Sequence, residues 1–198
     1  MRQSELARLT DMLGDMILKT RGLVIVVVLL AVGGALTGYF YLPSQKLHRL
    51  LGSRATKILS HPSRVEALRL GSASEVERAD AANSARIGGR FPVVTSHIVA
   101  KTGFGDELAD VLLDYKNYEL DPNRTSTCII DPALSFRIFS GDDFIDVLIC
   151  FKCNQLEILD SSGRTVSHYD LNIGPGRPRF AMLAKQAFKG DRVIGGIE

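Results

Sequence analysis

An uninterrupted apolar segment, Gly22 to Leu42, constrains this chain more than any other feature of its sequence. It reads GLVIVVVLLAVGGALTGYFYL and contains no charged residue. About 20 helical residues cross a hydrocarbon core of roughly 30 Å, whereas strands rarely exceed about 10 residues. The aromatic residues 39–41 at its end suit the membrane interface. The segment therefore predicts a transmembrane helix over residues 22–42.

Small residues recur at four-residue spacing along this predicted helix. Such spacing leaves a shallow groove in which the backbone of another helix can approach closely. Glycine and alanine are also common in membrane helices that have no packing partner, so both interpretations stay open. The candidate helix-packing residues are Ala31, Gly33, Gly34, Ala35, Thr37 and Gly38.

Residues 1–21 carry an apolar stripe at helical spacing, which predicts an amphipathic N-terminal helix. Such a helix can lie on a membrane surface, contact a neighbouring subunit, or remain solvated. The small residues 33–35 also resemble a signal-peptide cleavage site, although the apolar run continues past them to Leu42. An uncleaved anchor is the favoured interpretation.

Composition narrows the function classes. The 198 residues include 24 Lys and Arg against 22 Asp and Glu, a net charge of only +2. A nucleic-acid binder usually shows a basic stripe, so we expect no nucleic-acid partner. Three cysteines are too few for a disulfide-built scaffold. We expect a juxtamembrane helix and linker over 43–62 and a single domain over 63–198.

Periodicity within the domain predicts an α+β fold. We expect an antiparallel β-meander with two amphipathic helices on one face of the sheet. Alternating or β-branched runs predict strands, and two short turns predict hairpins. The expected strands are 64–70, 92–100, 134–140, 144–151, 155–160 and 164–169, and the expected helices are 105–118 and 178–189.

The cysteines Cys128, Cys150 and Cys153 form the main chemical constellation. The spacing Cys150-x-x-Cys153 between two strands can hold zinc, with Cys128 and His97 or His168 completing a site. A disulfide from Cys128 to Cys150 or Cys153 is a second interpretation if the domain is exported. A third is that the cysteines pack as small apolar residues.

Three further motifs are weaker. Gly103-Phe104-Gly105 before a helix resembles part of a phosphate-binding loop but lacks its third glycine. The segment 174–179 places two arginines at a helix start, where they either meet an anion or belong to a solvated loop. Asp142, Asp143 and Asp146 are interpreted as a charged turn.

Several of these pieces together resemble a known group of proteins. They are His61-Pro-x-Arg-Val-Glu-Ala-x-Arg-Leu70, Cys128, Leu148-Ile-Cys-Phe-Lys-Cys153 and Leu183-Ala-Lys-Gln-Ala-Phe188. The pattern is similar to small bacterial exported or membrane-anchored proteins with a C…CFxC motif. The resemblance covers roughly residues 60–190 and implies one bacterial domain, with no catalytic residue and no assigned function.

The functional hypothesis is a non-enzymatic, single-span accessory or structural subunit of a larger bacterial inner-membrane complex. Its expected partners are the lipid bilayer and other membrane subunits, and no cofactor is expected. A membrane-anchored thiol, zinc or small-ligand-binding domain is the alternative. Lys19 and Arg21 lie tight against the apolar segment, which favours a cytoplasmic N-terminus and a periplasmic domain, although Lys46 and Arg49 beyond it oppose this orientation.

Overall fold

The computed structural model describes residues 28–34, 37–38, 44–71, 85–120, 128–167 and 171–197. The chain divides into two compact units, residues 1–43 and 44–198, and each is described by itself.

The first unit contains an apolar helical segment. Residues 28–34 and 37–38 are helical, and Val28, Leu29, Leu30 and Val32 are 51–71% exposed. No helix within the described residues combines the length and apolar character needed to cross a membrane. The rest of the predicted span (22–27, 35–36 and 39–42) and the predicted N-terminal helix 1–21 lie outside the described residues. The transmembrane prediction therefore gains no support from the structure.

The second unit is built on one antiparallel sheet, which confirms the α+β prediction. Its strand order is β2-β3-β1-β4-β5-β6-β7, and neighbouring strands in this order run antiparallel. The strands are β1 Arg64–Leu70, β2 Arg86–Ile87, β3 Phe91–Ile98, β4 Leu134–Ser140, β5 Asp143–Cys150, β6 Gln155–Asp160 and β7 Leu171–Asn172.

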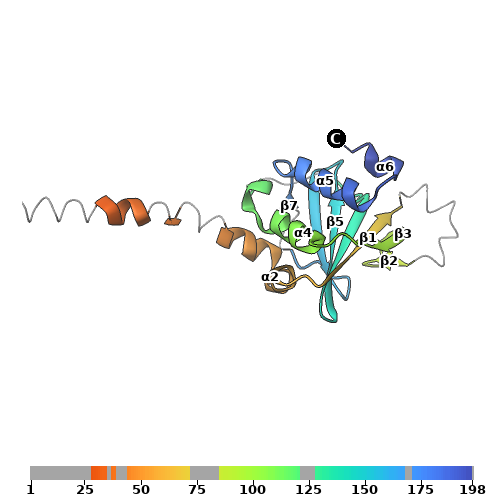
Figure 1. Ribbon diagram of the computed structural model, residues 1–198, viewed down its shortest axis with the longest axis horizontal. Helices are drawn as coiled ribbons and strands as arrows, with labels where there is room; N and C mark the ends of the chain where they lie inside the picture. Colours follow the sequence, from red (N-terminus) through yellow and green to blue (C-terminus); the bar gives the residue numbers. More distant parts are fainter. Residues whose placement is uncertain are drawn as a thin grey trace, which may run out of the picture. The chain divides into compact units, whose positions relative to one another are not determined.

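Helices pack on one face of this sheet (Figure 1). Strand alternation directs Leu134, Phe136 and Ile138 of β4 to this face, where all three are fully buried. Each such side chain contributes about 1.5–3 kcal/mol by leaving water. The helices are residues 44–51, α2 Ser53–Ser60, α4 Phe104–Leu113, the 3-10 turn η1 Tyr115–Asn117, α5 Arg177–Ala187 and α6 Arg192–Gly195.

The opposite face of the sheet is concave, because the sheet curls until the β2–β3 turn meets the turn after β6. A second apolar cluster joins Leu68 and Leu70 of β1, Ile87, Leu148 and Leu159. These residues come from four different strands, β1, β2, β5 and β6, and a flat sheet would keep β2 and β6 apart. The cluster therefore lies inside the curl.

Two glycines close the curl. Gly88, in the β2–β3 turn, and Gly163, in the turn after β6, approach so closely that a Cβ on Gly163 would lie 2.8 Å from Gly88 Cα. Both have positive φ, 55° and 79°. Beside them Arg90 donates to Glu157 of β6 at 2.7 Å. The β2–β3 hairpin is thus fixed to β6 and to the turn that follows it.

The predicted juxtamembrane segment belongs to the second unit's core. Leu47 and Leu51 are fully buried, and α2 adds Ala55, Ile58 and Leu59 to the same core. Gly52 separates the two helical pieces, with φ 85° and with Val166 O 2.8 Å from where its Cβ would stand. The exposed side of the segment carries Lys46, Arg49 and Lys57.

Two predicted elements differ from the structure, and three short elements, β2, β7 and α6, were not predicted. The helix expected over 105–118 ends at Leu113, where a 3-10 turn follows and buried Asn117 donates to Val111 O. The strand expected over 164–169 is reduced, within the described residues, to a single bridge between Leu159 and Thr165. The C-terminal α6 was not predicted, and Asp191 caps it through the Val193 and Ile194 amides.

Candidate functional sites

The small-residue stripe of the first unit presents an open surface. A Cβ added at Gly33, Gly34 or Gly38 would meet no atom within 4 Å. Thr37 donates its hydroxyl to Gly33 O at 2.8 Å, so this polar group is satisfied inside the helix. Ala31 is helical and exposed, whereas Ala35 lies outside the described residues. The described part of the stripe leaves room for a second helix to approach.

The structure separates the three cysteines into a disulfide and a thiol. Cys128 and Cys153 form a disulfide with their Cα atoms 6.0 Å apart. Cys150, the last residue of β5, is a free thiol and fully buried. The C-x-x-C spacing spans the β5–β6 turn, so its two sulfurs have different surroundings.

The predicted zinc ligands do not come together. Among the described residues, no group of three His, Cys, Asp or Glu side chains is placed to hold a metal ion. His97 lies on β3, where its Nε2 is 2.7 Å from Ala187 O and its ring meets Phe188 edge-on. His168 lies outside the described residues.

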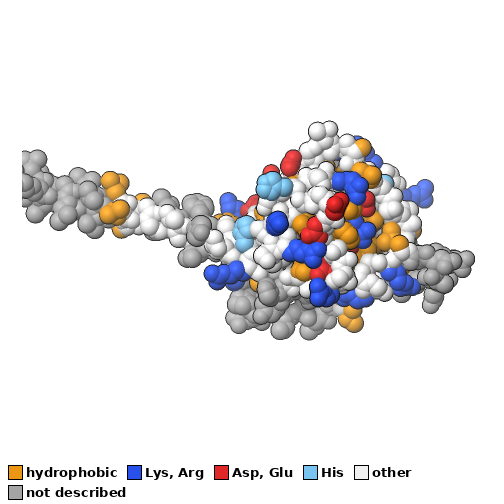
Figure 2. All heavy atoms as spheres, turned by 90° about the horizontal axis from the view of Figure 1, so that it is seen from below, with side chains coloured by type: hydrophobic (Ala, Val, Ile, Leu, Met, Phe, Trp, Pro, Cys, Tyr) orange, Lys and Arg blue, Asp and Glu red, His pale blue; other side chains and the backbone are white. Residues whose placement is uncertain are grey.

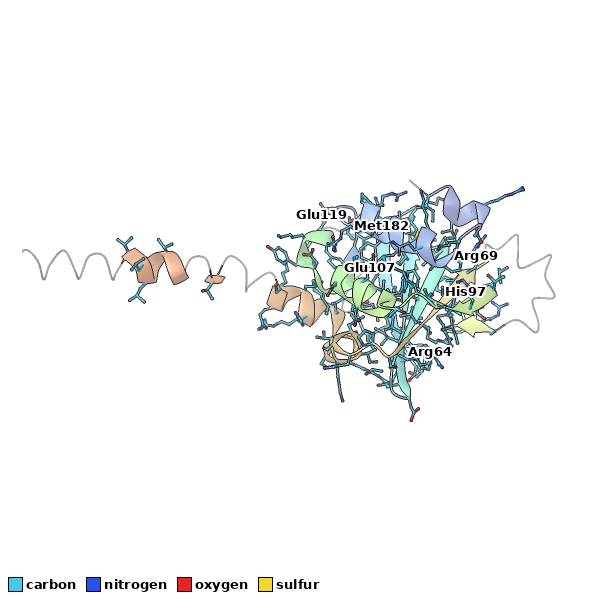
Figure 3. The ribbon with its side chains drawn as sticks, viewed as in Figure 1. Arg64, Arg69, His97, Glu107, Glu119 and Met182 are labelled. Atoms are coloured by element: carbon cyan, nitrogen blue, oxygen red, sulfur yellow. A yellow bond between two sulfur atoms is a disulfide. The ribbon has the colours of Figure 1, made fainter. Side chains whose placement is uncertain are left out.

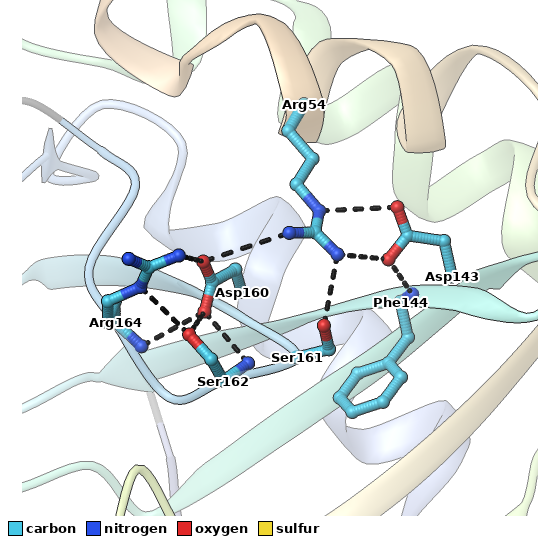
Figure 4. Close-up of polar contacts among 7 residues, drawn as sticks. All are labelled: Arg54, Asp143, Phe144, Asp160, Ser161, Ser162 and Arg164. Carbon is cyan, nitrogen blue, oxygen red and sulfur yellow. Dashed lines mark hydrogen bonds and ion pairs between the residues drawn. The ribbon is translucent and has the colours of Figure 1, made fainter.

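A polar cluster joins α2 to the turns at one end of the sheet (Figure 4). Arg54 of α2 makes two hydrogen bonds to the Asp143 carboxylate, at 2.5 and 3.2 Å, and one to Ser161 Oγ at 3.0 Å. Hydrogen bonding to Asp143 raises the Arg54 pKa, and the same contact lowers the pKa of Asp143. Arg54 therefore fixes α2 to the β4–β5 and β6 turns.

Asp160 is the most strongly bonded acid in this cluster. Its carboxylate accepts from Ser162 Oγ at 2.6 Å, Ser162 N at 2.9 Å and Arg164 N at 3.1 Å. These bonds, led by the Ser162 hydroxyl, lower its pKa to about 2. A carboxylate that holds a proton so weakly is a poor general base near neutral pH. The cluster is a structural clamp.

The glycine motif before α4 serves packing. Gly105 lies against Pro62 and Val65, whose atoms would be 3.3–3.6 Å from an added Cβ, and Phe104 is buried. The helix carries Asp106 and Glu107 in its first turn, and these acids already occupy the end that favours anions. The resemblance to a phosphate-binding loop is therefore superficial.

The two arginines at the start of α5 hold neighbouring elements. Arg177 donates to Asn154 Oδ1 at 2.6 Å and also to Phe151 O, both near the β5–β6 turn. Arg179 donates to Asp114 Oδ2 at 2.7 Å. Both cations are engaged by protein groups, which favours the structural interpretation of this segment.

The acidic residues of the β4–β5 hairpin also have structural partners. Asp146 is buried and accepts two hydrogen bonds from Arg137, at 2.8 and 3.0 Å. This contact raises the Arg137 pKa. Asp143 binds Arg54, and Asp142 lies exposed in the turn.

The concave face holds buried polar groups that sequence reasoning missed. Ser135 Oγ, both amide atoms of Gln155 and Glu157 Oε2 are buried without a hydrogen-bond partner. Gln155 pairs across the strands with Cys150, so its amide and the thiol share this face. The only sequence signal was the placement of polar residues at alternate strand positions. Each buried polar group without a hydrogen-bond partner lowers the folding stability by about 1–3 kcal/mol. Several such groups on one face of a sheet are therefore unusual.

One face of the molecule carries charges of both signs. On the face drawn in Figure 2, basic and acidic side chains of the described residues lie next to one another.

Comparisons with known proteins place the chain in no family. No family model matches it, and no curated protein and no solved structure is similar to it. The resemblance to small bacterial exported proteins therefore remains an expectation from sequence.

Proposed function

We propose that this protein is a membrane-anchored, non-enzymatic accessory subunit of a larger bacterial inner-membrane complex. The exposed apolar helix carries the proposal. Val28, Leu29, Leu30 and Val32 present more than half of their surface, and exposed apolar surface of this kind requires lipid or another helix to cover it. The uncharged run from Gly22 to Leu42 supplies the length for a span.

The small-residue stripe supports contact with another membrane subunit. Gly34 and Gly38 have no neighbouring atoms on their open side, and small residues at this spacing allow helix backbones to approach closely. The exposed cations Lys46 and Arg49 of helix 44–51 and Lys57 of α2 suit the phosphates of a nearby bilayer.

The disulfide supports a periplasmic domain. Disulfides persist in oxidising compartments and are rare in the cytosol, and the structure joins Cys128 to Cys153. The proposed orientation places the N-terminus inside the cytoplasm. Alkaline phosphatase, which folds only after export, should be active when fused at Glu198. An expressed but inactive fusion would contradict this orientation.

Anchoring and partner contact are tested separately. We expect the chain to remain in the membrane fraction after alkaline carbonate extraction, and release into the supernatant would refute the anchor. Gly34→Leu with Gly38→Leu should fill the stripe and reduce co-purification of partner subunits at least tenfold. Val28→Leu with Val32→Leu adds bulk at positions already occupied by aliphatic side chains and serves as the matched control. Equal co-purification of both variants would remove the stripe from the proposal.

A second candidate function, binding of a small polar ligand, rests on the concave face. The unpartnered Gln155 amide and Ser135 hydroxyl are buried there beside Cys150. Native mass spectrometry of the purified chain should then show a bound species that Gln155→Leu removes. If the mass shows no bound species and Gln155→Leu is more stable than the unmutated chain, the unpartnered Gln155 amide only lowers the stability of the fold and binds no ligand.

A further inference from the structure

The two helical pieces at the start of the domain form a basic surface. Residues 43–65 contain five Lys and Arg and no Asp or Glu, whereas residues 66–198 contain 15 Lys and Arg against 19 Asp and Glu. Figure 3 shows long side chains extending outward from helix 44–51 and α2, on the side of the domain away from Arg69 and His97. The positive part of the domain is therefore the part that directly follows the apolar run.

Two of these five cations have no hydrogen-bond or ion-pair partner. Arg49 and Lys57 are exposed, and within the part of the chain that the structure describes neither forms such a contact. Lys57 acts on Asp143 only through its charge, at longer range. The other three basic residues contact protein groups: Lys46 binds Leu120 O, Arg54 binds Asp143, and Arg64 binds Glu66. Arg49 and Lys57 are the cations that remain available to a ligand.

A hollow of about 430 Å³ at the junction of the two helical pieces joins these two cations. The chain turns at Gly52, whose φ is 85°. Backbone bonds from Gly52 N to His48 O and from Thr56 N to Gly52 O keep the helical spacing across this turn. The residues that line the hollow are His48, Arg49, Ser53, Thr56 and Lys57. One continuous surface thus combines side chains from both pieces.

The chemistry of the hollow suits a molecule with an anionic and an apolar part. The methylene stems of Arg49 and Lys57 are apolar, while their charged ends stay in contact with water. The planar guanidinium of Arg49 can bind two oxygens of one phosphate, and the Lys57 ammonium adds a point charge. The headgroup of a phospholipid presents a phosphate next to the carbon atoms of its glycerol. It therefore matches both features.

The chain brings this hollow close to the membrane surface, provided that residues 22–42 span the bilayer, so the inference rests on the proposed anchor. Arg49 follows Leu42 by seven residues, and the chain is helical from residue 44. Two linking steps and five helical steps reach no further than roughly 15 Å. This distance is similar to the depth of the headgroup region plus one Debye length.

We propose that this hollow binds the headgroup phosphate of an anionic phospholipid, with Arg49 and Lys57 as its charged contacts. The rest of the domain, residues 66–198, has more acids than bases. An anionic membrane surface therefore attracts the helical pieces and repels the remainder. The bound headgroup fixes which side of the domain faces the bilayer and which side stays open to a partner subunit.

A cysteine in the hollow reports this contact in the full chain reconstituted into vesicles. Ser53→Cys lies in the hollow, and Val193→Cys, exposed on α6 across the domain in Figure 1, is the matched control. The rate constant for labelling with an uncharged polyethylene-glycol maleimide is measured in two lipids. Ser53→Cys should react about tenfold more slowly in phosphatidylglycerol vesicles than in phosphatidylcholine vesicles, and the control should react equally in both. Equal rates for Ser53→Cys would overturn the proposal.

Charge-removal variants in the Ser53→Cys background identify the contacts. Arg49→Gln with Lys57→Gln should abolish the protection, because each cation at an anionic surface strengthens binding about fivefold and two cations roughly 25-fold. Lys185→Gln with Lys189→Gln removes the same charge from exposed positions elsewhere and should keep the protection. Arg49→Lys with Lys57→Arg keeps both charges and should also keep it. Equal loss in the two glutamine variants would overturn the site, because net charge alone would then explain the effect.

Failure of the anchor and failure of the headgroup site give different results. Flotation with phosphatidylcholine vesicles depends on the anchor and should be the same for every variant. A chain that floats only with phosphatidylglycerol vesicles would refute the anchor and support the headgroup site, and a chain that floats with neither would overturn both. Inorganic phosphate added to phosphatidylcholine vesicles should leave Ser53→Cys labelling unchanged. Protection by phosphate equal to that by phosphatidylglycerol would show a site for free ions and overturn the lipid proposal.

Discussion

β6 and the outer half of β3 are strands of one sheet with opposite surroundings. Every residue of β6 is buried although the strand includes Glu157 and Asp160. Every residue of β3 from Val94 to Ile98 is exposed although none is Asp, Glu, Lys or Arg. Composition therefore does not decide burial here. Position in the sheet does.

The difference follows from what lies beside each strand. β6 has β5 and β7 as neighbours, helices on one face and the curled first hairpin on the other. Its acids keep partners, Arg90 and Thr165 for Glu157 and Ser162 for Asp160. The outer half of β3 extends beyond β2, and within the described residues no strand pairs with it on that side. β6 therefore contributes buried area to the core, whereas residues 94–98 of β3 are part of the exposed surface.

The largest difference between the core of the sheet and the exposed half of β3 should appear in the unfolding free energy lost when a side chain is truncated to alanine. Phe136 is fully buried and packs against Phe104 at a ring distance of 5.7 Å. Phe136→Ala should cost about 3–5 kcal/mol of unfolding free energy. Ile98→Ala should change it by less than about 0.5 kcal/mol. Denaturation followed by circular dichroism measures both, and similar costs would contradict the assigned burial.

The disulfide should give the next largest effect. It joins Cys128 to the β5–β6 turn across a separation of 25 residues. Loop-closure entropy predicts a loss of about 3 kcal/mol when it is removed. Cys128→Ser with Cys153→Ser should therefore melt at a lower temperature than the oxidised chain, and a reducing agent should lower the oxidised chain to the same value. A reductant that has no effect on the unmutated chain would show that the bond does not form.

Closure of the curl gives a third comparison. Gly163→Ala places a methyl group against Gly88, at positive φ. Gly141→Ala has the same kind of φ, 62°, with open space around it, and is the matched control. Both substitutions carry the cost of the left-handed conformation, and overpacking should add about 1–3 kcal/mol to Gly163→Ala alone. Equal unfolding free energies would show that the two turns do not meet.

Local sequence patterns predicted most of the sheet and its helices. Alternation predicted β1, and the turn Gly141-Asp142-Asp143 predicted the β4–β5 hairpin, in which Asp143 is already the first residue of β5. The helix expected over 178–189 corresponds to α5, which runs from Arg177 to Ala187. These signals depend on neighbours in sequence. The missed α6 is only four residues long, too short for a periodic pattern.

The sites could not be predicted in the same way, because they depend on contacts across the fold. Gly105 was interpreted as a loop glycine, but Pro62 and Val65 lie against it. Nothing in the sequence near Arg54 indicates Asp143, which lies far along the chain and binds it. The curl itself depends on Gly88 meeting Gly163, and no local pattern states this pairing.

The smallest expected effect is the dependence of stability on pH through Asp160 of β6. Asp160 has a pKa of about 2 in the folded chain, compared with an ordinary value of 3.8. The lower folded value means that its ionised form stabilises the fold above pH 4, and that this contribution is lost as the pH falls from about 4 to 2. Asp160→Asn keeps an acceptor oxygen but no charge, so its unfolding free energy should depend less on pH across that window. Asp142→Asn, in the exposed turn, is the control and should leave the pH dependence unchanged. If Asp160→Asn and the unmutated chain lost stability in parallel between pH 4 and 2, the Ser162 and Arg164 contacts would not be holding the Asp160 carboxylate in its ionised form.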